Sequence, residues 1–255
     1  MTRATQPTID RARTLVEREI TLVDREREAF VRFLARLDEM DTPRSGGSVA
    51  ASDGPVALAA PETTPSAQLR AVRMAYRETV MAVSHYEQEY GDTLRESVAA
   101  EFGDALAGHL AERKSLTPAV YSALLKAGEQ ARADRTEFLR CLRRELQSLE
   151  KTAAELNEIE VEVVELSERV DAASTSTRLA DIDSSLATLE QRCTDCANSR
   201  QATIHGRSSG ATAGVDGASL LQYLYAGETQ TVTPVLSDVG SRLDAIRHQR
   251  ARCLR

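Results

Sequence analysis

The sequence predicts an all-α protein, built as a long-helix bundle or antiparallel coiled coil with shorter capping helices. Composition is the first reason, because aromatic residues make up only 4% of the chain while charged residues make up 28%, a profile typical of long helices. Secondly, apolar residues recur at steps of three and four along most of the chain. Thirdly, Thr-Pro pairs at Thr64, Thr117 and Thr233 precede such stretches, and this dipeptide favours a helix start.

The first predicted helix extends from Thr8 to Met40. Its apolar residues recur every seven positions and form one narrow seam, made of Ile9, Val16, Val23, Phe30 and Leu37. A lone seam of this kind needs a partner helix. Residues 42–63, which follow this N-terminal seam helix (residues 1–41), are rich in Pro, Gly, Ser and Ala and have no helical period. They are predicted to form a flexible linker.

Two shorter helices are predicted in the first part of a helical core of residues 64–205. One is amphipathic and extends from Pro65 to Tyr90, and the next begins after Asp92, which is expected to act as its cap. Gly103 is expected to bend or split that second helix before Arg113.

The longest predicted helix extends from Pro118 to Val170. Its seam steps by three and four, through Leu139, Leu142, Leu146, Leu149, Ala153, Leu156, Ile159, Val163, Leu166 and Val170. Arginine is concentrated in its first half and glutamate in its second half. Such a bipolar rod can pair antiparallel with its own copy or with a folded-back helix; alternatively, both charge runs are solvated faces.

After a break at residues 171–178, the seam resumes over Leu179–Ile204. We expect this helix, the first helix and the rod to share one seam. A Gly- and Ser-rich loop is predicted at residues 206–218, followed by C-terminal docking helices at residues 219–255. The C-terminal helices and those of residues 65–113 are expected to cap one end of the bundle.

Cys193 and Cys196 admit three interpretations. They continue the seam of Leu179–Ile204, and free cysteine packs as a small hydrophobic residue. They could also form a redox pair, or bind a metal together with His205. Cys141 and Cys253 stand alone and no second C-x-x-C exists, so we favour core packing, no metal and no cofactor.

The C-terminus is basic, ending with Arg247, Arg250, Arg252 and Arg255. These arginines are candidates for nucleic-acid contact, or they complement the dipole of the last helix. The net charge of the chain is −7, which argues against a protein whose main task is to neutralise phosphates. Nucleic-acid binding is therefore our second hypothesis.

No phosphate-binding glycine loop, nucleophile elbow or zinc-protease motif occurs in the sequence. We therefore expect no catalysis and no small-molecule ligand. No segment has the roughly 20 consecutive apolar residues that span a bilayer, and the N-terminus lacks the apolar region of a secretory signal. A cytoplasmic protein without membrane contact is the expectation.

Three segments carry a family resemblance: "YRETVMAVSHYEQEYGDTLRESVAAEFG", "LTPAVYSALLKAGEQARADRTEFLRCL" and "QYLYAGETQTVTPVLSDVGSRLDAIR". In them the chain resembles an uncharacterised family of helical proteins from haloarchaea. The resemblance implies a salt-rich cytoplasm and supplies no functional residues. Our leading hypothesis is therefore a non-enzymatic interaction or scaffold protein that binds a protein partner or its own copy through helix seams. The alternative is a nucleic-acid-associated regulator that uses the arginine-rich C-terminal helix on a helical dimerisation bundle.

Overall fold

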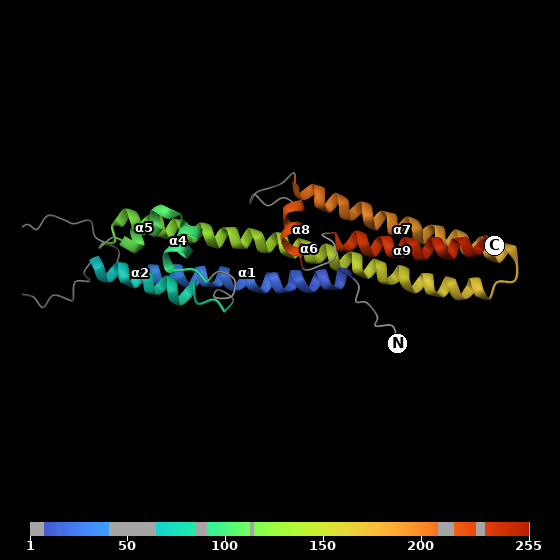
Figure 1. The fold of residues 1–255 in the computed structure, drawn as a ribbon, viewed down its shortest axis with the longest axis horizontal. Coiled ribbons are helices and arrows are strands. Elements are labelled where there is room, and N and C mark those ends of the chain that lie inside the picture. Colours follow the sequence, from blue (N-terminus) through green and yellow to red (C-terminus); the bar gives the residue numbers. More distant parts are fainter. Residues whose placement is uncertain are drawn as a thin grey trace, which may run out of the picture. The chain divides into compact units, whose positions relative to one another are not determined.

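The computed structural model describes residues 8–40, 65–84, 91–112, 115–208, 217–227 and 233–254 (Figure 1). Over these residues the fold is all-α, with eight helices and no strand, which confirms the predicted fold class. None of the described helices is both long and apolar enough to cross a membrane. The predicted linker of residues 42–63 and residues 209–216 of the predicted loop lie outside the described residues.

The chain divides into two compact units. Unit 1 consists of Met1–Ile20 and Arg140–Arg255, and unit 2 consists of Thr21–Leu139. Helices α1 (Thr8–Asp38) and α6 (Pro118–Asp171) are divided between the two units. Each of the other helices lies wholly within one unit or the other.

Unit 2 contains α2 (Pro65–Thr79), α4 (Leu94–Phe102) and α5 (Asp104–Glu112), together with parts of α1 and α6. Although aromatic residues are scarce in the chain, four of them meet in this core. Phe33 lies 5.4 Å from Tyr76 and 5.9 Å from Phe102 between ring centroids, and Phe30 lies 6.2 Å from Phe102. Tilted, edge-on and stacked ring contacts of this kind add to the stabilisation from burial.

Two helix boundaries in unit 2 differ from the sequence prediction. Helix α2 ends at Thr79 rather than at Tyr90, because the carbonyl of Tyr76 accepts hydrogen bonds from the amides of both Val80 and Met81 and the regular i to i+4 pattern stops. The remainder of the predicted helix, residues 85–90, lies outside the described residues.

The cap of α4 is Thr93 and not Asp92. The Thr93 hydroxyl accepts from the amide of Glu96 at 3.4 Å, and the Glu96 carboxylate accepts from the amide of Thr93 at 2.8 Å. This reciprocal pair is a capping box, in which the residue three positions after the cap closes the motif. Gly103 splits α4 from α5, as the sequence indicates, and its φ of 86° suits glycine.

Unit 1 is built on the second part of α6, on α7 (Ser176–Ser208), α8 (Gly217–Tyr225) and α9 (Pro234–Cys253), and on the start of α1. The predicted seam of α6 is buried in this unit at Leu142, Leu149, Ala153, Leu156, Ile159, Val163, Leu166 and Val170. The seam of α7 is buried at Ile182, Leu186, Leu189 and Cys193. The alternating spacing therefore identifies the buried face of both helices.

Ion pairs show that α6 and α7 run antiparallel. Arg200 pairs with Glu145, whereas Arg192, earlier in α7, pairs with Glu155 and Glu162, which lie later in α6. Hydrogen bonds with Glu155 and Glu162 raise the pKa of Arg192. Charge pairing thus accompanies the apolar seam along both helices.

The position of α9 corrects a prediction. Instead of capping one end of the bundle, α9 lies alongside α7 (Figure 1) and also follows α6, because its Arg242 pairs with Glu160 and its Arg252 pairs with Asp171. Its Asp238 accepts hydrogen bonds from the first amides of α1, at 2.8 Å from Ile9. A carboxylate there satisfies amides that have no partner within the helix.

A fully buried ion pair lies inside unit 1. Arg200 donates two hydrogen bonds to the carboxylate of Glu145, at 2.6 and 2.9 Å, and their side chains are 2% and 0% exposed. The phenol of Tyr225 on α8 donates to the same carboxylate at 2.7 Å, and Arg200 also contacts the hydroxyl of Ser148 at 3.2 Å. This network joins α6, α7 and α8.

We predict that Gly128 of α6 tolerates alanine but not leucine. A Cβ atom at this position meets Leu34 Cδ2 of α1 at 2.9 Å, which is the movable end of a side chain. The roughly 1 kcal/mol gain in helix propensity should offset that contact in Gly128→Ala, whereas overpacking should cost Gly128→Leu roughly 1–3 kcal/mol. Urea denaturation measures both variants, and equal stabilities would contradict the close approach of α1 and α6.

We also predict that Arg200→Met lowers the free energy of unfolding by roughly 3–5 kcal/mol, because the buried carboxylate of Glu145 loses its cation. The double variant Glu145→Leu/Arg200→Met should recover most of that loss, since apolar residues avoid the desolvation of both charges. A double-mutant cycle in urea tests this expectation. A double variant as unstable as the single one would show that the pair is not the source of the effect.

Candidate functional site

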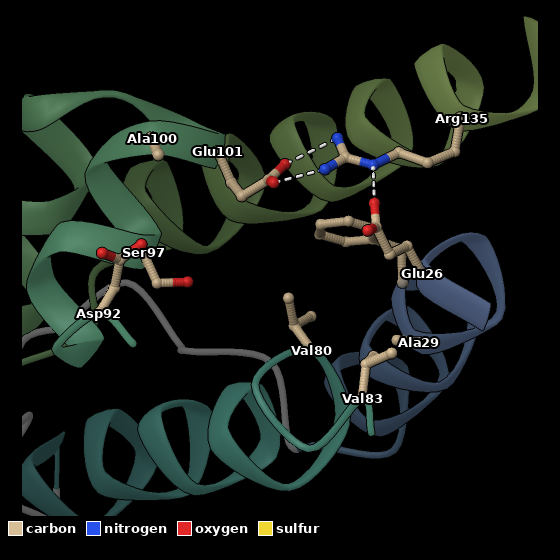
Figure 2. Close-up of a pocket in the computed structure, with 10 residues that line it drawn as sticks. Glu26, Ala29, Val80, Val83, Asp92, Ser97, Ala100, Glu101 and Arg135 are labelled. Carbon is tan, nitrogen blue, oxygen red and sulfur yellow. Dashed lines mark hydrogen bonds and ion pairs between the residues drawn. The ribbon is translucent and has the colours of Figure 1, made fainter. Parts of the chain in front are cut away.

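A small cavity of about 50 Å³ lies in unit 2 (Figure 2). Its apolar wall comes from α1 and from the turn that follows α2, at Ala29, Phe30, Val80 and Val83. Its polar residues are Glu26, Asp92, Ser97, Glu101 and Arg135. A mixed lining of this kind resembles a ligand site. Whether the cavity can bind a ligand depends on whether its charged side chains are already paired with one another.

Arg135 is the centre of that charged group. Its Nη1 and Nη2 donate to the Glu101 carboxylate at 2.8 and 2.5 Å, and its Nε donates to Glu26 at 3.2 Å (Figure 2). The guanidinium also lies 5.0 Å from the ring centroid of Phe30. Burial lowers the pKa of Arg135, but the charges and hydrogen bonds of Glu101 and Glu26 outweigh it and raise the pKa.

The cavity fits a structural role better than a catalytic one. Ligand sites usually enclose about 300–1,000 Å³, whereas this cavity has room for only about one or two waters. Arg135 is bound to carboxylates from α4 and α1, so its donors serve to tie three helices together. We therefore assign the cavity to the packing of unit 2.

The cysteine candidates occupy different environments. Cys193 is fully buried among the seam residues, as core packing predicts, whereas Cys196 is only half-buried. Burial, followed by the neighbouring Cys196, raises the pKa of Cys193 to about 11, and burial raises the pKa of Cys196. Both thiols are thus poor nucleophiles at neutral pH. Among the side chains that the structure describes, no three His, Cys, Asp or Glu residues are placed to hold a metal ion.

The remaining metal candidate, His205, has its side chain outside the described residues. Arg255, one of the four nucleic-acid candidates, also lies outside them. The other three arginines of that set are described and occupy α9.

These three arginines face carboxylates of their own unit. Arg250 pairs with Asp183 at 2.9 Å and with Glu190 at 2.7 Å, and Arg247 pairs with Glu190 at 2.9 Å. Arg252 pairs with Asp171. The three arginines that the sequence indicates as nucleic-acid candidates therefore join α9 to α7 and α6. Phosphates would have to displace the carboxylates in order to bind these arginines.

A second stripe of α6 faces solvent, which the sequence prediction missed. We call it the outer stripe: Arg143, Gln147, Glu150, Ala154, Asn157, Val161, Val164 and Glu168, all exposed. It repeats the alternating steps of three and four about 100° around the helix from most of the buried seam. Val161 and Val164 are 58% and 54% exposed. The spacing of the stripe is visible in the sequence, but so few of its residues are apolar that hydrophobic periodicity does not predict it.

The ion pairs between α9 and α7 should make the stability of the protein depend on pH in the acidic range. Hydrogen bonds from Arg250 lower the pKa of Asp183, and those from Arg247 and Arg250 lower the pKa of Glu190. A lowered folded-state pKa contributes stability above the unfolded pKa of about 4, and this contribution is lost as pH falls through the folded value.

We therefore predict that Arg250→Ala lowers the free energy of unfolding by roughly 0.5–1 kcal/mol at pH 7. Below about pH 4 the difference in free energy of unfolding between the variant and the original chain should shrink, because Asp183 and Glu190 become protonated. Urea denaturation at pH 7 and pH 3 measures this difference. The matched control is Arg144→Ala, an exposed arginine for which no ion pair is found among the described residues; a gap as large at pH 3 as at pH 7 would refute the assignment.

Comparison with known proteins identifies a family. No curated protein and no solved structure matches the chain. A family model described as a domain of unknown function, DUF7260, matches residues 7–250, which include all of unit 2 and all of unit 1 except residues at the two chain ends. The chain therefore belongs to the DUF7260 family of domains of unknown function.

Proposed function

We propose that this chain is a non-enzymatic interaction or scaffold protein, which binds another protein chain through coiled-coil contacts of its long helix α6. The observation that carries the proposal is the outer stripe. Val161 and Val164 stand 58% and 54% exposed on a helix whose other apolar residues in this unit are largely buried. A stripe with coiled-coil spacing fits another helix.

Two further features support this proposal. The buried network of Glu145, Arg200 and Tyr225 holds α6 in place, so the stripe is presented on a rigid support. A rigid surface loses less conformational entropy on binding than a flexible one. We place this scaffold in the cytoplasm of a haloarchaeal cell, as the family resemblance suggests.

The alternative function, a nucleic-acid-associated regulator, has less support. Arg247, Arg250 and Arg252 each pair with carboxylates of unit 1. Exposed, clustered cations would be needed to release counterions from a phosphate backbone. The interaction hypothesis therefore ranks first.

A photoreactive amino acid at position 161 tests the proposal. We expect the full chain, irradiated in its host cells, to form adducts with another polypeptide, because Val161 would lie against a partner helix. Mass spectrometry identifies the cross-linked peptide, and its sequence should show apolar residues at alternating steps of three and four.

The matched control carries the same amino acid at position 74. Met74 is also an exposed apolar residue, at 46%, but it belongs to unit 2. Adducts from position 161 but not from position 74 would support the proposal if the captured peptide shows the alternating steps of three and four, whether it comes from this chain or from another protein. No adduct from position 161, or equal yields from both positions, would refute it.

A further inference from the structure

The charges of the outer stripe change sign along α6. Arg143 stands at one end and Glu168 at the other, with the small residues Ala154 and Asn157 in the middle. At 1.5 Å per residue the two ends are about 38 Å apart. We propose that this stripe pairs antiparallel with the same stripe of a second copy of the chain, so that Arg143 of each copy meets Glu168 of the other. The inference rests on the proposed function and names the partner.

The spacing of the stripe permits this arrangement. From Arg143 to Glu168 its steps are four, three, four, three, four, three and four, which read the same in both directions. An antiparallel copy can therefore place every position of the stripe opposite another position of the stripe. In this register Ala154 faces Asn157 of the second copy, and Gln147 faces Val164.

Charge selects the antiparallel direction. Among the described residues, no ion pair involves Arg143 or Glu168, and both side chains are exposed. Antiparallel pairing places opposite charges together at both ends of the stripe, whereas parallel pairing in register places arginine against arginine and glutamate against glutamate. Opposite charges stabilise such contacts and like charges destabilise them.

The centre of the stripe fits a second helix sterically. Ala154 has the smallest side chain of the stripe and adjoins Asn157 on the same face, and small residues allow two helices to approach closely. Val161 and Val164 lie to one side of that centre in each copy, where they face Glu150 and Gln147 of the other copy. Most of the stripe is polar, and this composition favours reversible association.

Charge reversal tests the register. Sedimentation of the full chain at low ionic strength should show a dimer that forms with rising concentration. Arg143→Glu and Glu168→Arg should each raise its dissociation constant about tenfold, because each reversal acts at both ends of a symmetric pair. The double variant Arg143→Glu/Glu168→Arg should restore the dissociation constant of the original chain, since the opposite charges meet again.

The matched control is Arg144→Glu, which carries the same charge change about 100° around the helix from the stripe. It should leave the dissociation constant unchanged, and circular dichroism should show equal helix content in all variants. A chain that stays monomeric, a double variant that is not restored, or a control that weakens the dimer as much would each overturn the inference. Adducts at position 161 with a different protein, together with a monomeric chain, would overturn it while leaving the proposed function intact.

Discussion

The register of unit 1 depends on the buried pair between Glu145 and Arg200. A seam of leucines at steps of three and four is nearly unchanged when one helix slides by a heptad, so apolar burial alone does not select one alignment of α6 and α7. A buried ion pair selects one alignment, because any other alignment leaves each buried charge without its counter-charge. The loss of the counter-charge costs several kcal/mol in free energy of unfolding. The partly exposed pairs of Arg192 then follow from the alignment rather than determine it.

The sequence predicts the helices well because their causes are local. Helix α6 is expected from Pro118 to Val170 and extends from Pro118 to Asp171, since a proline start and a periodic seam both act within a few residues. The early end of α2 at Thr79 depends on how one carbonyl is shared between two amides. The place of α9 depends on carboxylates far along the chain. Neither can be read from periodicity.

The same distinction explains the candidate sites. The burial of Cys193 follows from the seam, so the spacing predicts it. The pairing of Arg250 with Asp183 joins residues 67 positions apart, and an arginine cluster in sequence looks basic whether or not acids surround it in space. The outer stripe is not predicted for a different reason: its period is clear, but apolar periodicity identifies buried faces and most residues of this stripe are polar.

Helix α6 thus carries two faces with the same period and different chemistry. Its inner seam is leucine-rich, dry and aligned by a buried ion pair, which suits a contact made once, during folding. Its outer stripe has two valines among charged and amide side chains. A wholly apolar outer stripe on so long a helix would expose a large patch and promote aggregation. A mostly polar stripe avoids this. In the pairing that we propose, its charged ends would distinguish one partner orientation from another, which is what a reversible and specific contact requires.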